Sequence, residues 1–463
     1  MHARRFVPTL FGILVASAVI LGACAPATPA LAPTSAPAAT QPPVVQTVVV
    51  QQTVPVTVAV PVPVTVTPAP TAAQAATSAQ PVTITYWHSH NPVETKELEG
   101  TVIPAFEKAH PNIIVQDQVI PTNDFHKKLL TAIAGGTAPD VARIDIAWLP
   151  EFGDLGALAT LDTLMPDFST FQNAVYPGPL STNLLKGHYY GLPLDTNTRV
   201  WVWNKDLYTK AGLSAAPTTI DDMLADCAKL KSAANAACYA DGGTYGWAVM
   251  PWIWSMGGDI TDPGMTVSTG YVNGPKTVAA YQMLKDMLDK GYLDKSILGG
   301  SYDTYGAFAK DNLANFLDGP WMPPLLAAQY PNKAVNFSLM PAGQAGAISV
   351  VGGEDIAVFQ ESKNQAAAAE FVRFMLSPEA QLDMATTGQM PVRPDVADQA
   401  VKAQPYFQVF FDQLKTARAR LPHPNWSQIE SILTDAGQVI LRGEQPPQAA
   451  LDAAAKKIDP LLK

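Results

Sequence analysis

The chain has 463 residues, of which 48% are hydrophobic, and it carries a formal net charge of −10 at pH 7. This length is too great for one ordinary hydrophobic core, so we expect at least two structural lobes. The acidic balance argues against nucleic acid and anionic lipid as partners, because both repel negative charge.

A secretory signal peptide is predicted over residues 1–23. Arg4 and Arg5 introduce a short apolar stretch at residues 10–21, and small residues lead to Cys24. This is the pattern of a bacterial export signal, and the apolar stretch is shorter than the ~20 residues that span a bilayer. The four residues that end at Cys24 resemble the lipobox of bacterial lipoproteins, which implies cleavage before Cys24 and a lipid attached to it. An ordinary signal peptide that happens to contain a cysteine is the alternative.

Residues 24–80 are predicted to form a disordered tether between this lipid and the rest of the chain. No charged residue occurs from Ala25 to Gln80, and the stretch is rich in Pro, Ala, Thr, Val and Gln. Closely spaced prolines remove backbone donors, so neither helix nor sheet can propagate. A β-rich stalk is the alternative, because the alternation of Val and Thr favours strands.

The two cysteines after Cys24 are Cys227 and Cys238. In an oxidising compartment they are able to close a short loop by a disulfide. Such a bond restricts the unfolded chain and thereby stabilises the fold by ~3 kcal/mol. Two unpaired thiols are the alternative, because a sequence does not reveal the separation of two Cα atoms.

Strands alternate with helices from Pro81 onward. Residues 82–87 alternate apolar and polar side chains, which predicts a strand, and apolar residues at helical spacing follow up to Ala109. A second strand starts at Ile113, a helix capped by Asn123 ends at Gly135-Gly136, and a third strand covers residues 139–144. This order predicts an α/β fold with mostly parallel sheets flanked by helices. Such sheets bind ligands at the carboxyl ends of their strands.

Motifs spread over residues 82–463 resemble those of the family 1 extracellular solute-binding proteins, the sugar-capturing components of ATP-binding-cassette (ABC) importers, which include maltose- and oligosaccharide-binding proteins. In chain order they occupy residues 106–112, 129–141, 190–193, 203–208, 319–321 and 369–381. The resemblance implies a type II periplasmic-binding-protein fold, in which a ligand cleft lies between two α/β lobes.

The resemblance also implies where the lobes lie along the chain. We expect an N-terminal lobe of residues 81–197 plus 357–390 and a C-terminal lobe of residues 198–356 plus 391–463. Crossing segments are expected near residues 197–202, 350–359 and 390–394. Because several crossings restrict the motion to a hinge, the lobes are expected to close around the ligand.

Aromatic residues point to a sugar, because one face of a pyranose presents C–H groups that stack on a flat ring. The resemblance nominates Trp252, Trp254 and Trp321 for this contact, with core packing as the alternative for each. Replacement of Trp252 by alanine is accordingly expected to weaken sugar binding with little loss of fold. Trp201 and Trp203 are expected in the core, because their strand is apolar on both faces.

Polar residues near the predicted strand ends and crossings are candidates for contacts with sugar hydroxyl groups. Carboxylates accept charge-assisted hydrogen bonds from hydroxyls, whereas turn formation or a solvated surface is the alternative for the acidic members. The candidates are His88, Asp145, Asp195, Asn197, Gly353, Glu354 and Arg393.

Three rival functions were weighed. A glycosidase is disfavoured, because Glu354 and Asp355 are adjacent and point to opposite faces of a strand. A metal site is disfavoured, because His88 and His90 do not complete a tetrahedral set. A phosphorylated ligand such as glycerol phosphate competes more strongly with a sugar than these two functions do, because Arg393 or a helix N-terminus is able to hold a phosphate. We therefore predict a monomeric, non-catalytic, cofactor-free sugar receptor, tethered by lipid outside the cytoplasm, with a permease and its ATPase as partners.

Overall fold

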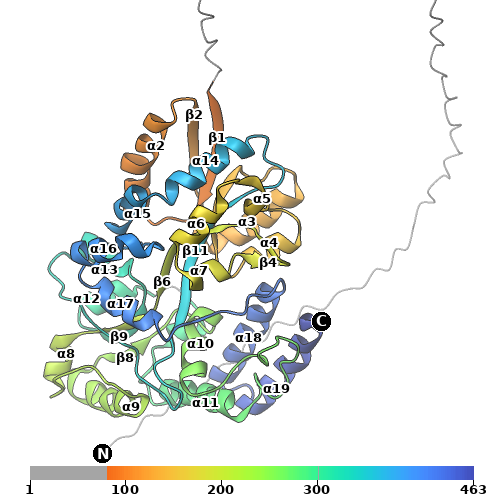
Figure 1. Ribbon diagram of the computed structural model, residues 1–463. Helices are drawn as coiled ribbons and strands as arrows, with labels where there is room; N and C mark the ends of the chain where they lie inside the picture. Colours follow the sequence, from red (N-terminus) through yellow and green to blue (C-terminus); the bar gives the residue numbers. More distant parts are fainter. Residues whose placement is uncertain (1–80, 301) are drawn as a thin grey trace, which may run out of the picture. The chain divides into compact units, whose positions relative to one another are not determined.

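The computed structural model describes residues 81–300 and 302–463 (Figure 1). The predicted signal peptide, Cys24 and the predicted tether fall in residues 1–80 and lie outside the described residues. Within the described ranges, no helix has both the length and the apolar character needed to span a bilayer.

The first sheet begins as the sequence predicts. β1 (Val82–His88) pairs in parallel with β2 (Ile113–Val119) and with β3 (Val141–Asp145). A helical segment made of α1 (Pro92–Glu97), η1 (Leu98–Val102) and α2 (Ile103–Ala109) joins β1 to β2, and α3 (Thr122–Ala134) joins β2 to β3. The strand and helix order at the start of the globular part is therefore confirmed.

The cap of α3 differs from the prediction. The helix begins at Thr122, so Asn123 lies inside it, and Pro121 occupies the cap position without a side-chain hydrogen bond. The predicted end is confirmed, because Gly136 adopts a left-handed φ of 63° directly after the helix.

The remaining strands of the first sheet run in both directions. β11 (Val350–Val358) lies antiparallel between β3 and β6 (Leu192–Thr198), and the short β12 (Arg418–Ala419) pairs in parallel with β11. The sheet is therefore mixed: the predicted parallel pairing holds for β1, β2 and β3 and for the short β12 beside β11, whereas β11 is antiparallel to both β3 and β6. The reason is that β6 leaves this sheet for the second one whereas β11 returns from it, so the two strands run in opposite directions.

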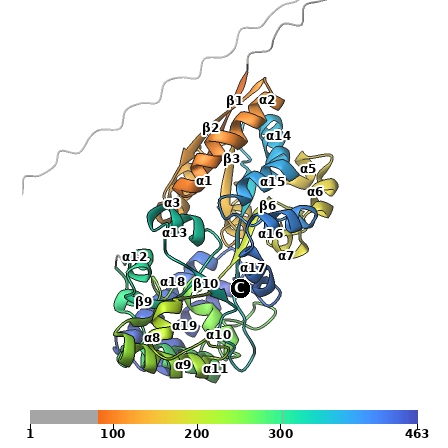
Figure 2. The ribbon, with the colours of Figure 1, turned by 90° about the vertical axis from the view of Figure 1, so that its left-hand side faces the viewer.

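Helices cover both faces of the first sheet (Figures 1 and 2). On one face, η1, α2 and α14 (Gln365–Met375) pack against alternate residues of β1, β3 and β11. On the other face, α3 and α4 (Leu149–Asp154) pack against the intervening residues, such as Ala142 and Ile144. Both faces of β3 are thus buried, which explains why its residues are apolar apart from Arg143 and the last residue, Asp145.

The second sheet is smaller and is also mixed. β7 (Val200–Trp203) is antiparallel to β9 (Leu313–Asp318) and to β10 (Asn336–Ser338), and β8 (Ala237–Ala240) is parallel to β9. Its largest core cluster combines β7, β8 and β9 with α9 (Ile220–Lys229), α10 (Gly246–Ser255), α11 (Pro275–Asp289), α18 (Trp426–Leu441) and α19 (Pro447–Ile458). In this lobe Cys227 and Cys238 form a disulfide, with their Cα atoms 5.1 Å apart.

The other elements are short connections around the two sheets. They are α5 (Leu161–Leu164), α6 (Phe168–Ala174), α7 (Pro177–Ser181), β4 (Leu184–Leu185), β5 (His188–Tyr189), α8 (Lys205–Lys210), η2 (Leu230–Ala234), η3 (Lys295–Leu298), α12 (Thr304–Ala309), α13 (Met322–Gln329), α15 (Pro378–Ala385), η4 (Pro394–Val396), α16 (Ala397–Ala403), α17 (Phe407–Leu414) and η5 (Asp459–Leu462).

Three chain segments lie side by side where the two sheets meet. β6 passes into β7 with only Arg199 between them, and β11 follows β10 of the second sheet. Beside them, the amide of Thr196 in β6 donates a hydrogen bond of 3.1 Å to the carbonyl oxygen of Met390. The segments at residues 197–202, 350–359 and 390–394 thus lie next to one another, while their role as a hinge and the lobe boundaries stay predictions.

Candidate functional site

The candidate site is centred on three charged side chains from β3, β6 and β11. Arg143 Nε and Nη2 donate to Asp195 Oδ2 at 3.2 and 3.1 Å, and Nη2 lies 2.7 Å from Glu354 Oε2. Asp195 and Glu354 are direct partners in the antiparallel register of β6 and β11. One guanidinium therefore holds two carboxyl groups at the predicted crossing, where Arg143 and Asp195 are both buried.

The protonation of Glu354 is shifted by this arrangement. Burial raises the pKa of the Glu354 carboxyl well above its usual range, and the nearby Asp195 adds to the rise, although Arg143 opposes it. Glu354 consequently keeps a proton more readily than a free glutamate does. A carboxyl group in this state donates one hydrogen bond as well as accepting others.

Two glycines of β11 allow close approach to this cluster. Gly353 has a φ of 131°, and a Cβ there would collide with the carbonyl oxygen of Asp195. A Cβ on Gly352 would collide with Asn197 Oδ1 and with the indole ring of Trp247. The predicted site residue Gly353 therefore shapes the site through the absence of a side chain.

A pair of indole rings lies beside the crossing strands. Trp247 at the start of α10 and Trp321 before α13 have ring centroids 6.3 Å apart and planes inclined by 29°. The guanidinium of Arg420 lies 5.5 Å from the Trp247 ring centroid, and its Nη2 donates to Asp145 Oδ1 at 2.6 Å. The predicted residues Asp145 and Trp321 are thus connected through Arg420 and Trp247, neither of which was predicted.

The burial of Trp252 and Trp254 speaks against their predicted contact with a ligand. Their exposed fractions are 1% and 2%, and both belong to the large core of the second lobe. Trp252 packs edge-on against Trp201, with ring centroids 6.3 Å apart. Both residues lie in α10, which continues through Pro251 and is buried along most of its length. Trp201 is buried in the core, as expected.

The other predicted polar residues have different surroundings. His88 is buried, its Nε2 lies 3.1 Å from Asp117 Oδ2, and burial lowers its pKa. Asn197 is buried, and its Oδ1 has no hydrogen-bonding partner among the described residues. Arg393 Nε and Nη2 donate to Asp395 at 3.0 and 2.6 Å. Because its guanidinium is already occupied, Arg393 is a poor candidate for holding a phosphate.

The second lobe contributes two carboxyl groups that the sequence analysis did not select. Asp318 ends β9, and Asp241 directly follows β8, so both lie at the carboxyl end of this parallel pair. Asp318 accepts hydrogen bonds from Tyr305 Oη at 2.9 Å and from the amide of Gly319 at 2.8 Å. Burial raises the pKa of Asp318 to about 6. Asp241 accepts from Arg199 at 2.8 Å and from Tyr239 at 2.7 Å.

An open pocket of ≈ 700 Å³ lies next to α1 in the first lobe. Its polar lining comes from His90, Thr95, Lys96 and Glu99. The volume falls in the range of about 300–1,000 Å³ that is typical of small-molecule sites. The position of such residues just after β1 agrees with ligand binding at the carboxyl ends of parallel strands.

The sequence and the fold have close counterparts among known proteins. The sequence profile of the bacterial extracellular solute-binding proteins matches residues 91–382. A Brucella abortus protein, named only as a binding protein, is 28% identical over 378 residues, which cover 78% of this chain and 88% of that protein. The sn-glycerol-3-phosphate-binding periplasmic protein UgpB of Yersinia pseudotuberculosis is 24% identical over 82% of this chain and 92% of its own length.

The fold is similar to that of a solved ABC transporter solute-binding protein from Thermotoga lettingae, which was crystallised with α-D-tagatose. The TM-score is 0.76 at 25% sequence identity, and the match covers 82% of this chain and 100% of that protein.

Proposed function

Because the chain belongs to the family of bacterial extracellular solute-binding proteins, we propose that it captures a sugar outside the cytoplasm and delivers it to an ABC importer. The contact between Trp247 and Trp321 carries this proposal, because two indole faces beside hydrogen-bonding carboxyl groups suit a ligand that is apolar on its ring faces and polar around its edge. The tagatose complex of the similar Thermotoga protein supports the same ligand class.

The charges around the site favour an uncharged ligand. Arg143 is paired with Asp195 and Glu354, Arg199 with Asp241, and Arg420 with Asp145. Each of these guanidinium groups therefore has a carboxylate partner in place of a ligand phosphate. Hydroxyl groups are able to bind the same carboxyl groups without breaking these ion pairs.

A glycerol-3-phosphate-like ligand is the second candidate. It is favoured by the similarity to the Yersinia glycerol-3-phosphate-binding protein and by Lys96, which lines the open pocket next to α1. In this alternative Lys96 would meet the phosphate, and Arg393, which is bound to Asp395, would not.

Ser427, His126 and Glu151 have the residue types of a hydrolytic triad but not its arrangement. His126 Nε2 lies 2.8 Å from Glu151 Oε2 and 3.3 Å from Ser427 Oγ. In a hydrolytic triad the acid and the serine bind different nitrogens of the imidazole ring. Here both face Nε2, so the histidine is not oriented to activate the serine.

Transport requires that the permease distinguish the receptor with bound ligand from the empty receptor. We propose that the lobes, 81–197 plus 357–390 and 198–356 plus 391–463, close about the crossing segments when the sugar binds. The lipid on Cys24 and the tether of residues 24–80 would keep this monomeric receptor at the outer face of the membrane, near the permease and its ATPase.

Calorimetry on the full chain tests the ligand class. A panel of mono- and oligosaccharides is compared with glycerol-3-phosphate, and solution scattering is recorded with the tightest ligand. We expect saturable heat from at least one saccharide, compaction of the molecule on binding, and no hydrolysis products. Binding of glycerol-3-phosphate alone would select the second candidate, and saccharide turnover would contradict a purely binding role.

A further inference from the structure

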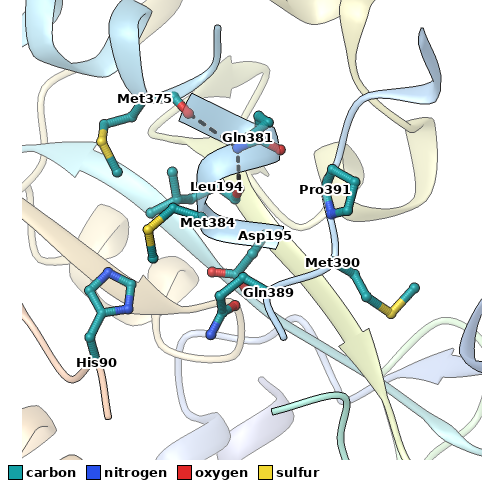
Figure 3. Close-up of a pocket in the computed structure, with 9 residues that line it drawn as sticks. All are labelled: His90, Leu194, Asp195, Met375, Gln381, Met384, Gln389, Met390 and Pro391. Carbon is teal, nitrogen blue, oxygen red and sulfur yellow. Dashed lines mark hydrogen bonds between the residues drawn. The ribbon is translucent and has the colours of Figure 1, made fainter. Parts of the chain in front are cut away.

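A small internal cavity lies behind the candidate site, between the loop that follows β1 and the crossing strand β6 (Figure 3). His90 and Asp195 line it, and both side chains are more than nine-tenths buried. His90 Nε2 and Asp195 Oδ1 have no hydrogen-bonding partner within the described part of the chain. Two buried polar atoms without partners therefore face the same cavity, which is costly unless something else binds them.

The hydrogen bonds of Glu94 determine the tautomer of His90. Glu94 Oε2 accepts from the amide of Asn91 at 3.0 Å and lies 3.2 Å from His90 Nδ1. Glu94 Oε1 accepts from Asn91 Nδ2 at 2.5 Å and from Gln389 Nε2 at 2.6 Å. These three donors favour the ionised form of Glu94, against the rise in its pKa that burial causes, so we place the proton of His90 on Nδ1. Because burial lowers the pKa of His90 well below its usual range, Nε2 is left as an acceptor.

Asp195 also presents an acceptor to the cavity. Its Oδ2 takes both hydrogen bonds from Arg143, which leaves Oδ1 free. The charge of the Asp195 carboxylate is already balanced by this guanidinium, so the cavity has no need of a cation.

The donors of the amide side chains that line the cavity bond to groups other than His90 Nε2 and Asp195 Oδ1. Gln381 Nε2 donates to the carbonyl oxygens of Leu194 and Met375 at 2.7 and 3.1 Å, as the dashed lines in Figure 3 mark. The side-chain nitrogen of Gln389 is already bonded to Glu94. The other lining side chains are apolar or thioethers. The cavity thus presents two acceptors, and no lining side chain donates a hydrogen bond to either of them.

We infer that this cavity is a binding site for one water molecule, which donates one hydrogen to His90 Nε2 and the other to Asp195 Oδ1. The centre of a water molecule has ≈ 10 Å³ to move in within this cavity, which is the lower end of the about 10–15 Å³ that one buried water needs. A larger polar ligand does not fit. The inference does not depend on which solute the protein transports.

The bound water would connect the loop after β1 to β6, next to the third crossing segment. His90 follows β1, Asp195 belongs to β6, and Met390 and Pro391 of the third crossing line the same cavity. With Oδ2 held by Arg143 and Oδ1 held by the water, the plane of the Asp195 carboxyl group is fixed opposite Glu354. The water is therefore a structural part of the wall behind the site.

A high-resolution crystal structure and magnetic relaxation dispersion of water in the full chain test the inference. We expect a water about 2.7–3.2 Å from both His90 Nε2 and Asp195 Oδ1. In ¹⁵N spectra, His90 should show a protonated Nδ1 and an unprotonated Nε2. Met384 lines the cavity, so Met384→Phe should fill it and remove one long-lived water from the dispersion, whereas Met384→Leu should retain that water.

Three results would overturn the inference: no water density between the two atoms, a proton on His90 Nε2, or an equal dispersion amplitude in both Met384 variants. If Met384→Phe does not fold, the crystal structure and the ¹⁵N spectrum of the unaltered chain decide the question. If a monovalent cation occupies the cavity in place of the water, no molecule there exchanges with labelled water. This result would also contradict the inference.

Discussion

Ser427 and Glu151 join two separate hydrophobic cores by a short hydrogen bond. Ser427 Oγ donates to Glu151 Oε2 at 2.6 Å, and His126 Nε2 lies 2.8 Å from the same oxygen. Glu151 lies in α4, whose Phe152 belongs to a core of the first sheet, whereas Ser427 lies in α18, whose Ile429 belongs to the core of the second sheet. The two lobes are therefore in contact away from the crossing strands.

Replacement of Ser427 by alanine is predicted to loosen the two lobes. A hydrogen bond to a charged group contributes about 1.5–3 kcal/mol, and its loss leaves Glu151 with His126 alone. We expect a broader distribution of distances between spin labels placed on α5 and on α9, measured by pulsed electron resonance without ligand.

Ser181→Ala is the matched control for this variant. Ser181 Oγ donates to the carbonyl oxygen of Gly178 at 2.6 Å, a contact within α7 that does not involve the second lobe. An equal effect of the two substitutions, or no broadening with Ser427→Ala, would show that the contact with Glu151 does not restrain the lobes.

Trp247→Ala is predicted to weaken ligand binding at least about tenfold, which corresponds to about 1.4 kcal/mol. The half-buried ring of Trp247 lies against Gly352 of a crossing strand and near Trp321, so its removal takes away a ring face at the candidate site. Trp247→Phe keeps a ring and should retain most of the affinity. Calorimetry with the saccharide selected above measures both variants.

Trp252→Ala should behave differently, because the ring is part of the core. Truncation of a fully buried tryptophan costs about 3–5 kcal/mol of stability, so this variant should unfold at a lower denaturant concentration. Its folded fraction should bind with nearly normal affinity. A large loss of affinity in a fully folded Trp252→Ala variant would restore the original prediction and remove Trp247 from the central role.

The contrast between these tryptophans shows what the sequence was able to predict. β1 and β3 were found because their patterns are local, a short alternation in one and a short apolar run in the other. In α10 nearly every residue is apolar and buried, so the sequence has no polar face that marks the orientation of the helix. Contacts with residues far away in the sequence, such as Gly352 and Trp321, distinguish Trp247 from its neighbours.

The central ion cluster was missed for a similar reason. Asp195 and Glu354 were predicted, but Arg143 lies in an apolar stretch and was assigned to a strand only. It meets the two carboxyl groups because β11 is inserted between β3 and β6 in one register, a pairing of distant segments that local patterns do not specify. Arg143 could have been identified as an arginine within an apolar strand, close to the carboxyl end where such sheets bind ligands.

Asp318→Asn is predicted to stabilise the protein at neutral pH and not in acid. Burial raises the pKa of Asp318 from 3.8 to about 6, so between these values the folded state binds more protons than the unfolded state. The free energy of unfolding therefore falls as the pH rises through this window. The contribution of Asp318 to stability is lowest above pH 6. The shift corresponds to at most about 3 kcal/mol.

Chemical unfolding of both proteins across this pH range measures the difference. The gain of Asp318→Asn should disappear below about pH 4, where the aspartate is protonated in both states. Tyr305→Phe is the control, because it removes the hydroxyl that donates to Asp318 and leaves the titrating carboxyl in place. A gain that is the same at all pH values would contradict the raised pKa and indicate a simple packing effect.

Removal of the disulfide is predicted to lower stability without affecting ligand binding. Cys227 and Cys238 are separated by 11 residues, and a cross-link over such a loop contributes about 3 kcal/mol by restricting the unfolded chain. Both residues are buried, so alanine is a better replacement than serine, which would place a hydroxyl group in the core. The double alanine variant should unfold at lower denaturant concentration, and a reductant should destabilise the unaltered protein by a similar amount while leaving the variant unchanged. Equal stability of the unaltered protein with and without reductant would show that the bond contributes nothing to the folded state.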